Sequence, residues 1–142
     1  LLKPFLTAVI EQQKLKASKP CIITMSCSDD LVVETDPIHF SNIIGNLIDN
    51  SIKYSGESVE IHIEADNNGI SVKDNGIGIP EKSLSEVFNK FYRVPNGNRT
   101  DVRGYGIGLF YVKSIVEKHG WTISVKSKVK EGSRFIINFK RI

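Results

Sequence analysis

One carboxylate in this chain has a sequence position that calls for a partner. Residues 70–73 alternate apolar and polar side chains as a half-buried strand does, and Asp74 continues the phase of Ile70 and Val72. An unpaired carboxylate on the apolar side of a sheet is costly, so it needs a donor. The turn over 75–80 contains two glycines, which let a ligand approach the backbone. A ligand with a donor edge, such as the adenine amino group, would satisfy Asp74, and a plain strand-ending turn explains the stretch equally well.

Amide side chains form a stripe on a helix predicted to run from Asp36 to about Tyr54. Asn46 and Asn50 lie one turn apart, opposite the apolar side of this helix, and Lys53 follows on the same side. Asn is a poor helix former, so repeated Asn residues in a helix interior call for a reason. Amide oxygens suit Mg²⁺, which prefers oxygen ligands. A hydrated helix face is the alternative interpretation.

A glycine-rich run, residues 104–109, opens a helix predicted to continue to about His119. Glycines at a helix N-terminus expose N–H groups at the positive end of the helix dipole, which favours an anion. The run lacks the preceding strand and the spacing of a dinucleotide motif, so alone it is a weak signal. Residues 94–103 before it are nearly all polar, which predicts a mobile segment, either a lid over a site or an ordinary surface loop.

The remaining patterns predict the elements that would position these groups. Helical periodicity is expected over residues 2–17, 36–54 and 104–119, with a short helical stretch over 81–88. Strands are expected over residues 21–27, 31–35, 59–65, 70–74, 121–126 and 133–140. The first two strands should be joined by the polar turn at 28–30, and a hairpin turn is expected at 66–69.

Composition limits the class of protein. The chain has 142 residues, 40% hydrophobic and 25% charged, which fits one globular domain. Its formal net charge is +3, and the basic residues are scattered along the chain, which argues against a nucleic-acid surface. No apolar stretch approaches the roughly 20 residues of a membrane helix.

Cys21 and Cys27 lie about 20 Å apart on one predicted strand, so free thiols and a cytosolic setting are expected. The chain starts at Leu1 without Met, and we expect it to be part of a longer protein.

Four separated blocks together resemble the catalytic ATP-binding domain of two-component sensor histidine kinases, a branch of the superfamily of gyrase, Hsp90 and MutL ATPases. The blocks match the family's N, G1, F and G2 boxes and are Asn46–Tyr54, Asp74–Pro80, Val87–Arg93 and Gly104–Leu109. The resemblance covers nearly the whole chain, so residues 1–142 are expected to form one such domain. It implies an α/β two-layer sandwich, a mixed sheet of about five to six strands with helices on one face, and an ATP lid between the F and G2 boxes.

The resemblance also implies roles for single residues. Asn50 would bind Mg²⁺, and Asn46 would support the phosphates and a metal-bound water. Lys53 and Arg93 would contact the phosphates and complete the catalytic set with Asn46, while Asp74 would accept a hydrogen bond from the adenine amino group. The other expected nucleotide contacts are Tyr54, Gly76, Gly78, Ile79, Tyr92, Arg99, Gly104, Tyr105, Gly106, Ile107, Gly108, Leu109 and Ser133.

Three positions depart from the family pattern. Ser133 stands where the family usually has a threonine near the adenine pocket, and Ser51 stands where alanine is frequent. Trp121 replaces a frequent glycine. None of these changes removes a group that nucleotide binding requires.

The implied function is binding of Mg-ATP and transfer of its γ-phosphoryl group to a histidine in a separate dimerisation domain of the same parent. None of His39, His62 and His119 has the sequence context of the family's phosphoacceptor. The implied partners are that dimerisation domain and a response regulator, with no nucleic acid. The implied location is the bacterial cytoplasm, with the parent at the inner membrane.

Two other functions stay open at this point. One is a regulatory nucleotide-binding module or a serine kinase of the anti-sigma-factor type, which an upstream helical segment bearing a phosphoacceptor histidine would exclude. The other is an ATPase of the gyrase or Hsp90 type. That ATPase would need a general-base Glu where Asn46 stands, so we expect poor hydrolysis.

Overall fold

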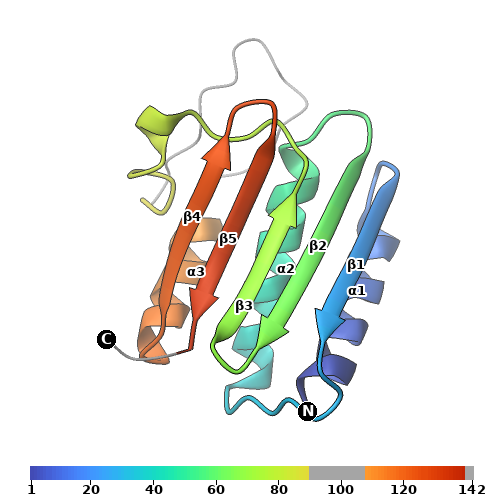
Figure 1. The fold of residues 1–142 in the computed structure, drawn as a ribbon, viewed down its shortest axis with the longest axis vertical. Helices are drawn as coiled ribbons and strands as arrows, with labels where there is room; N and C mark the ends of the chain where they lie inside the picture. The colour runs from blue at the N-terminus through green and yellow to red at the C-terminus, as the bar shows by residue number, and fades with distance from the viewer. Residues whose placement is uncertain (90–107, 140–142) are drawn as a thin grey trace.

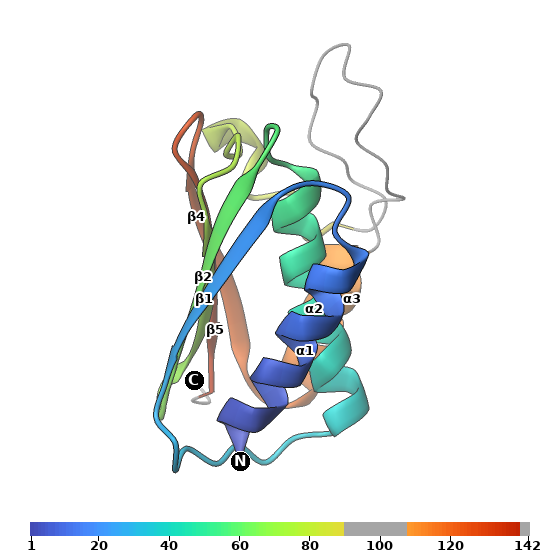
Figure 2. The same cartoon turned by 90° about the vertical axis from the view of Figure 1, so that its right-hand side faces the viewer.

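The computed structural model describes residues 1–89 and 108–139, and these form a sheet covered on one face by helices. Figure 2 shows the two layers edge-on. The elements are α1 (Leu2–Lys16), β1 (Cys21–Cys27), α2 (Pro37–Lys53), β2 (Val59–Asp66), β3 (Gly69–Asp74), the 3₁₀ turn η1 (Glu81–Ser83), α3 (Gly108–Lys118), β4 (Thr122–Lys128) and β5 (Gly132–Asn138). The predicted two-layer α/β sandwich is confirmed.

The strands of the described residues form one mixed sheet in the order β1-β2-β3-β5-β4 (Figure 1). β1 and β2 are parallel and are joined through α2, whereas the β2–β3, β3–β5 and β4–β5 pairs are antiparallel. A parallel pair needs such a crossover, because the chain must return to the end of the sheet where the first strand began before it starts the second. This connection carries α2 across the sheet and ends it beside the C-terminal end of β3 (Figure 1).

The core lies between the sheet and the helices. Strand alternation directs one face of β2, β3 and β5 inward, and helical spacing directs one side of α1, α2 and α3 onto it. Its largest fully buried side chains are Phe40, Phe135, Leu6, Ile43, Ile44, Leu47, Ile48, Ile61, Ile63, Ile137, Val59 and Val72. Leu15, near the end of α1, lies outside this core and is 87% exposed.

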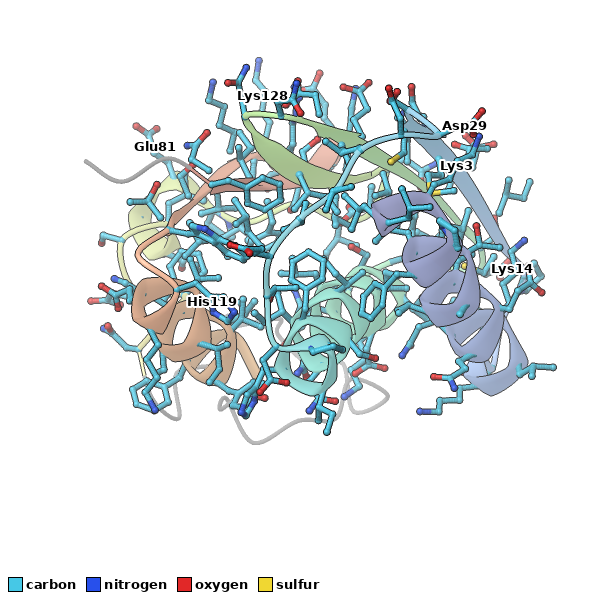
Figure 3. All side chains as sticks on the ribbon, turned by 90° about the horizontal axis from the view of Figure 1, so that it is seen from below. Lys3, Lys14, Asp29, Glu81, His119 and Lys128 are labelled. Atoms are coloured by element: carbon cyan, nitrogen blue, oxygen red, sulfur yellow. The ribbon has the colours of Figure 1, made fainter. Side chains whose placement is uncertain are left out.

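The strand predicted over Leu31–Thr35 is wrong. These residues are not in the sheet, and β1 pairs with β2 instead. Leu31 is nevertheless buried, and its carbonyl accepts a hydrogen bond from the Leu2 N–H at 2.9 Å. Lys3 and Asp29 form an ion pair in the same region, with Lys3 Nζ 2.8 Å from Asp29 Oδ1 (Figure 3). The apolar alternation of this segment therefore reflects anchoring to the start of α1 and not strand pairing.

The helical stretch predicted over residues 81–88 is only partly correct. Its hydrogen bonds join residues three apart, as in the Ser83 N–H to Pro80 carbonyl and the Glu86 N–H to Ser83 carbonyl, so it forms η1 and successive turns. Phe88 at its end packs edge-on against Phe135 of β5. The last two strands are each shifted slightly from the predicted bounds, and residues 140–142 lie outside the described range.

His119 follows the last turn of α3, and its contacts give it a structural role. Its Nε2 lies 2.8 Å from Thr35 Oγ1, its Nδ1 lies 2.9 Å from the Ile115 carbonyl oxygen, and its ring stacks on that of Trp121. Both cysteines are free, as predicted, and half-buried. In the part of the chain that the structure describes, no helix has the length and apolar character needed to span a membrane.

Candidate functional site

Asp74 is a buried carboxylate at the C-terminal end of β3, with 6% of its surface exposed. Its Oδ1 accepts hydrogen bonds from the backbone N–H groups of Gly76 at 2.8 Å and Ser133 at 3.2 Å. Burial raises the pKa of Asp74, and the Gly76 N–H, the Ser51 hydroxyl and the Ser133 N–H oppose that rise. Asp74 is therefore held in one orientation by the backbone while lacking a full set of donors.

The turn after Asp74 is tied to two other elements. The Ile77 N–H donates to the carbonyl of Tyr54 at the C-terminal end of α2, at 3.0 Å. The Ile77 carbonyl accepts from the Lys130 N–H at 2.8 Å, which joins the turn to the β4–β5 connection. The sequence predicted Tyr54 as a nucleotide contact, and the structure gives its backbone an additional role in holding the turn.

Three glycines permit this close packing. Gly78 and Gly132 have φ of +77° and +113°, which L side chains rarely adopt. A Cβ on Gly78 would collide with the Lys128 carbonyl, and one on Gly132 with the Asp74 carbonyl. A Cβ on Gly76 would collide with the Tyr54 carbonyl. Gly76 and Gly78 were predicted from the sequence, whereas Gly132 was missed.

A pair of hydroxyl groups links the turn to the β4–β5 hairpin. Ser127 Oγ accepts from the Ile79 N–H at 2.7 Å and donates to the Gly132 carbonyl at 2.9 Å. It also lies 2.7 Å from Ser133 Oγ. A hydroxyl has one proton to donate. Because Ser127 donates its proton to the Gly132 carbonyl, Ser133 Oγ is the donor in the hydrogen bond between the two serines. Ser127 was missed by sequence reasoning, and the only signal for it is its register opposite Ser133 in the β4–β5 pair.

The amide groups of α2 are half-buried and accessible on its outer side. Asn46 Nδ2 donates to the Asn42 carbonyl at 2.8 Å. Its Oδ1 faces the start of α3, where a Cβ added to Gly108 would approach it to 3.4 Å. Lys53, predicted to contact phosphate, is exposed, and its Nζ lies 3.0 Å from Asp49 Oδ2. Asn50 lies one turn after Asn46 on the same helix, as predicted.

The described part of the glycine-rich run begins α3, and the helix packs against α2. Tyr111 Oη lies 3.0 Å from His39 Nδ1 and 3.4 Å from Asn42 Nδ2. Gly108 and Leu109 are half-buried at the first turn of α3. Seven predicted site residues and the predicted lid lie outside the described residues. Those residues are Tyr92, Arg93, Arg99, Gly104, Tyr105, Gly106 and Ile107.

The sequence matches the family described as histidine kinase-, DNA gyrase B- and HSP90-like ATPases over residues 35–141. The chain belongs to this family. The match spans both the Asn-bearing helix α2 and the Asp74 turn, so the resemblance read from the four blocks is confirmed. It is the type of ATP-binding domain that sensor histidine kinases carry.

Named relatives of this ATPase domain are sensor kinases. The sensor protein RprX of Bacteroides fragilis is 44% identical over 112 residues, which cover 75% of this chain and 22% of that protein. Sensor histidine kinase WalK of Bacillus subtilis is 34% identical over 134 residues, which cover 87% of this chain and 22% of that protein. The chain thus spans about a fifth of the length of these two relatives.

A solved structure has the same fold. The catalytic domain of histidine kinase ThkA superposes with a TM-score of 0.73 at 25% identity, covering 96% of this chain and 92% of that one. The sheet order and helical layer of the ATPase domain described above therefore belong to the fold of a histidine kinase catalytic domain.

Proposed function

We propose that this domain binds Mg-ATP where α2, the Asp74–Pro80 turn and the start of α3 come together, and that it supplies the γ-phosphoryl group to a histidine elsewhere in its parent protein. The observation that carries the proposal is the buried carboxylate of Asp74. Both of its backbone donors reach Oδ1, which leaves Oδ2 to accept from a ligand amino group. Residues 1–142 are proposed to be one domain of a longer chain.

The α2 amides and the start of α3 are suited to the phosphate end of ATP. Asn50 would hold the Mg²⁺, and Asn46 would support the phosphates, because amide oxygens are acceptable ligands for a hard cation. The Mg²⁺ would neutralise phosphate charge, and the N–H groups at the start of α3 favour an anion. Lys53 would reach the phosphates by exchanging its contact with Asp49. Tyr92, Arg93 and Arg99 complete the proposed set from outside the described residues.

The contacts of the three histidines support an acceptor from another segment. His39 Nδ1 lies 3.0 Å from Tyr111 Oη, and His119 is bonded on both ring nitrogens. His62 Nδ1 lies 2.6 Å from Thr24 Oγ1 on the face of the sheet without helices. We propose that the acceptor histidine belongs to a dimerisation domain of the same parent, with a response regulator downstream. We further propose that the domain acts in the bacterial cytoplasm, with its parent at the inner membrane.

The experiment is a calorimetric titration of ATP, ADP and GTP into the domain with Mg²⁺, followed by addition of a histidine-bearing dimerisation domain and labelled ATP. We expect adenine-selective binding in the micromolar range and an acid-labile, base-stable phosphoryl group on the added domain. Equal binding of ATP and GTP would contradict the role of Asp74. An acid-stable phosphoserine product would contradict the histidine kinase proposal and show that the domain acts as a serine kinase.

A further inference from the structure

A row of basic residues crosses the open face of the sheet, which is the side opposite the helices (Figure 2). Lys73 of β3 lies directly opposite Arg134 of β5, and Arg134 lies directly opposite Lys126 of β4. All three side chains are exposed. They point away from the core, because their chain neighbours Val72 and Phe135 are buried between the sheet and the helices. The register therefore places three positive charges side by side across three adjacent strands.

This row carries more positive charge than the fold neutralises. Like charges directly opposite one another destabilise a sheet. Among the residues that the structure describes, neither Lys73 nor Lys126 forms an ion pair. Arg134 has a distant one, with its Nη2 3.9 Å from Glu64 Oε2, and the other oxygen of that carboxylate lies 3.4 Å from His62 Nε2. A partner that brought carboxylates to the row would relieve the repulsion.

Two hollows lie beside the row on the open face. The larger, of about 650 Å³, is lined in part by Lys73, and the smaller, of about 340 Å³, is lined in part by Ile136. Glu64, Ser71 and Arg134 line both. Ser71 is small and only 6% exposed, so it forms a low floor where the hollows meet, and half-buried Ile136 lies directly opposite it. The face next to the bases is thus recessed and offers an apolar contact.

We propose that the open face docks an acidic α-helix of a partner protein, which lies across the strands with a line of carboxylates paired to Lys73, Arg134 and Lys126. Neighbouring strands lie roughly 4.8 Å apart. Residues three or four positions apart on a helix have Cβ atoms roughly 5–6 Å apart. Three acidic residues at positions i, i+4 and i+7 of one helix therefore match the three bases one to one.

The acidic neighbours of the row favour a protein helix over an anionic membrane. Glu60, Glu64 and Glu131 line the larger hollow beside the bases. A lipid surface presents anions in every direction and would meet these carboxylates as well as the bases, whereas a helix presents its carboxylates along one line. Lys73 and Asp74 are consecutive in β3 and point to opposite faces of the sheet, so this inference does not rest on the proposed nucleotide site.

The test uses two alanine-based helical peptides of equal composition. The one-sided peptide carries three glutamates at positions i, i+4 and i+7, and the dispersed peptide carries the same three glutamates around the helix. Fluorescence anisotropy measures the binding of each peptide to the domain at low ionic strength and at about 0.15 M salt. We expect the one-sided peptide to bind roughly tenfold more tightly, as for three exposed ion pairs, and salt to weaken its binding.

Substitutions in the row identify the surface that binds the one-sided peptide. Lys126→Gln and Arg134→Gln should each weaken its binding roughly two- to fivefold, as for one exposed ion pair. Lys128→Gln is the matched control and should leave the affinity unchanged. Lys128 lies two residues from the row on the same face of β4, and its Nζ is 3.6 Å from Glu131 Oε2. Without peptide, Lys126→Gln should melt no lower than the wild type, because it removes a like-charge repulsion.

Three results would overturn the inference: no measurable binding of the one-sided peptide, equal affinities for the two peptides, or equal losses in Lys126→Gln and Lys128→Gln. Vesicles that contain phosphatidylserine test the membrane alternative. If they bind the wild type more tightly than Lys126→Gln while the one-sided peptide does not bind, an anionic membrane replaces the acidic helix. Titration of Mg-ATP into Lys126→Gln should match the wild type, so failure of the proposed function and failure of this inference appear in different measurements.

Discussion

Burial raises the pKa of Asp74 above its ordinary value of 3.8, mainly because the charged form is removed from water. The folded state therefore binds this proton more tightly than the unfolded chain does. The resulting stabilisation is fully present below the unfolded pKa and is lost as pH rises through the folded pKa. At neutral pH the ionised Asp74 thus weakens the ligand-free fold, and a ligand that donates to it removes this penalty.

Asp74→Asn should separate these two effects. The amide oxygen can still accept from Gly76 and Ser133, so the melting temperature without ligand should rise slightly. ATP affinity should fall by more than about tenfold, or 1.4 kcal/mol, because a buried acceptor for the amino group becomes a donor. Calorimetry and thermal unfolding measure both quantities. The control is Asp66→Asn. Asp66 Oδ1 also accepts from two backbone N–H groups, but it lies in an exposed turn, so this substitution should leave ATP affinity unchanged. Unchanged affinity in Asp74→Asn would refute the adenine contact.

Asn50→Ala tests the proposed metal ligand. Removing its amide oxygen should abolish the Mg²⁺ dependence of ATP binding, because the remaining protein contacts do not require the cation. The measurement is ATP titration with Mg²⁺ and with a chelator, for the variant and the wild type. Asn42→Ala on the same outer face of α2 should keep the dependence. A persistent difference between the two conditions in Asn50→Ala would place the metal ligand elsewhere.

Single residues with a local signal were predictable from the sequence. Asp74 is a carboxylate at an apolar position in the alternation of its strand, and Gly76 and Gly78 follow within four residues, so one short stretch carried the prediction. Ser127 and Gly132 act through the register of β4 against β5 and through their approach to the Asp74 turn. Such long-range contacts leave no pattern along a single chain, which is why both residues were missed.

Between elements, Ser127 joins β4 to the turn after β3, and Ser127→Ala should loosen that connection. The variant leaves the Ile79 N–H and the Gly132 carbonyl without their partner, at a cost of about 1–3 kcal/mol. Urea unfolding should show this loss, and ATP affinity should fall with it because the turn is less well positioned. Ser124→Ala, an exposed serine on the same strand, is the control and should change stability by about 0.5 kcal/mol or less. If Ser127→Ala and Ser124→Ala were equally stable, the hydrogen bonds of Ser127 would not contribute to the stability of the fold.

The turn itself depends on a backbone conformation that only glycine adopts easily. Gly78→Ala places a Cβ at φ +77° against the Lys128 carbonyl and should destabilise the fold by about 2 kcal/mol or more. Gly56→Ala is the matched control, because nothing lies within 4 Å of its added Cβ. Urea unfolding of both variants decides the question, and a Gly78→Ala variant as stable as Gly56→Ala would mean that the turn relaxes freely.

Element prediction failed where tertiary contacts override local pattern. Residues 31–35 alternate like a strand, yet Leu31 is held by the core and by α1 while β1 pairs in parallel with β2. Strong local signals held better: Asp36 caps α2 by accepting from the N–H groups of Ile38 and His39, as Asp before Pro predicts. Local chemistry thus predicted where α2 begins, and pairing across the sheet decided which extended segments became strands.

On the scale of the whole molecule, the site draws on distant parts of the chain. The end of α2, the turn after β3 and the β4–β5 hairpin meet around Asp74, and the start of α3 lies beside Asn46. Figure 1 shows the end of β3, the hairpin and the end of α2 at one end of the sheet. A ligand held by all of these elements should oppose unfolding of the entire domain and not only of one loop.

Mg-ATP should therefore raise the melting temperature of the domain as a single transition. At 100 times its dissociation constant, a ligand that binds only the folded state adds about 2.7 kcal/mol. For a domain of this size that is a shift of roughly 5–10 °C. Differential scanning calorimetry with ATP, GTP and Asp74→Asn measures it, and GTP and the variant should give much smaller shifts. An equal shift with GTP would show that binding rests on the phosphates alone, and a transition that splits in two would show that the site stabilises only part of the fold.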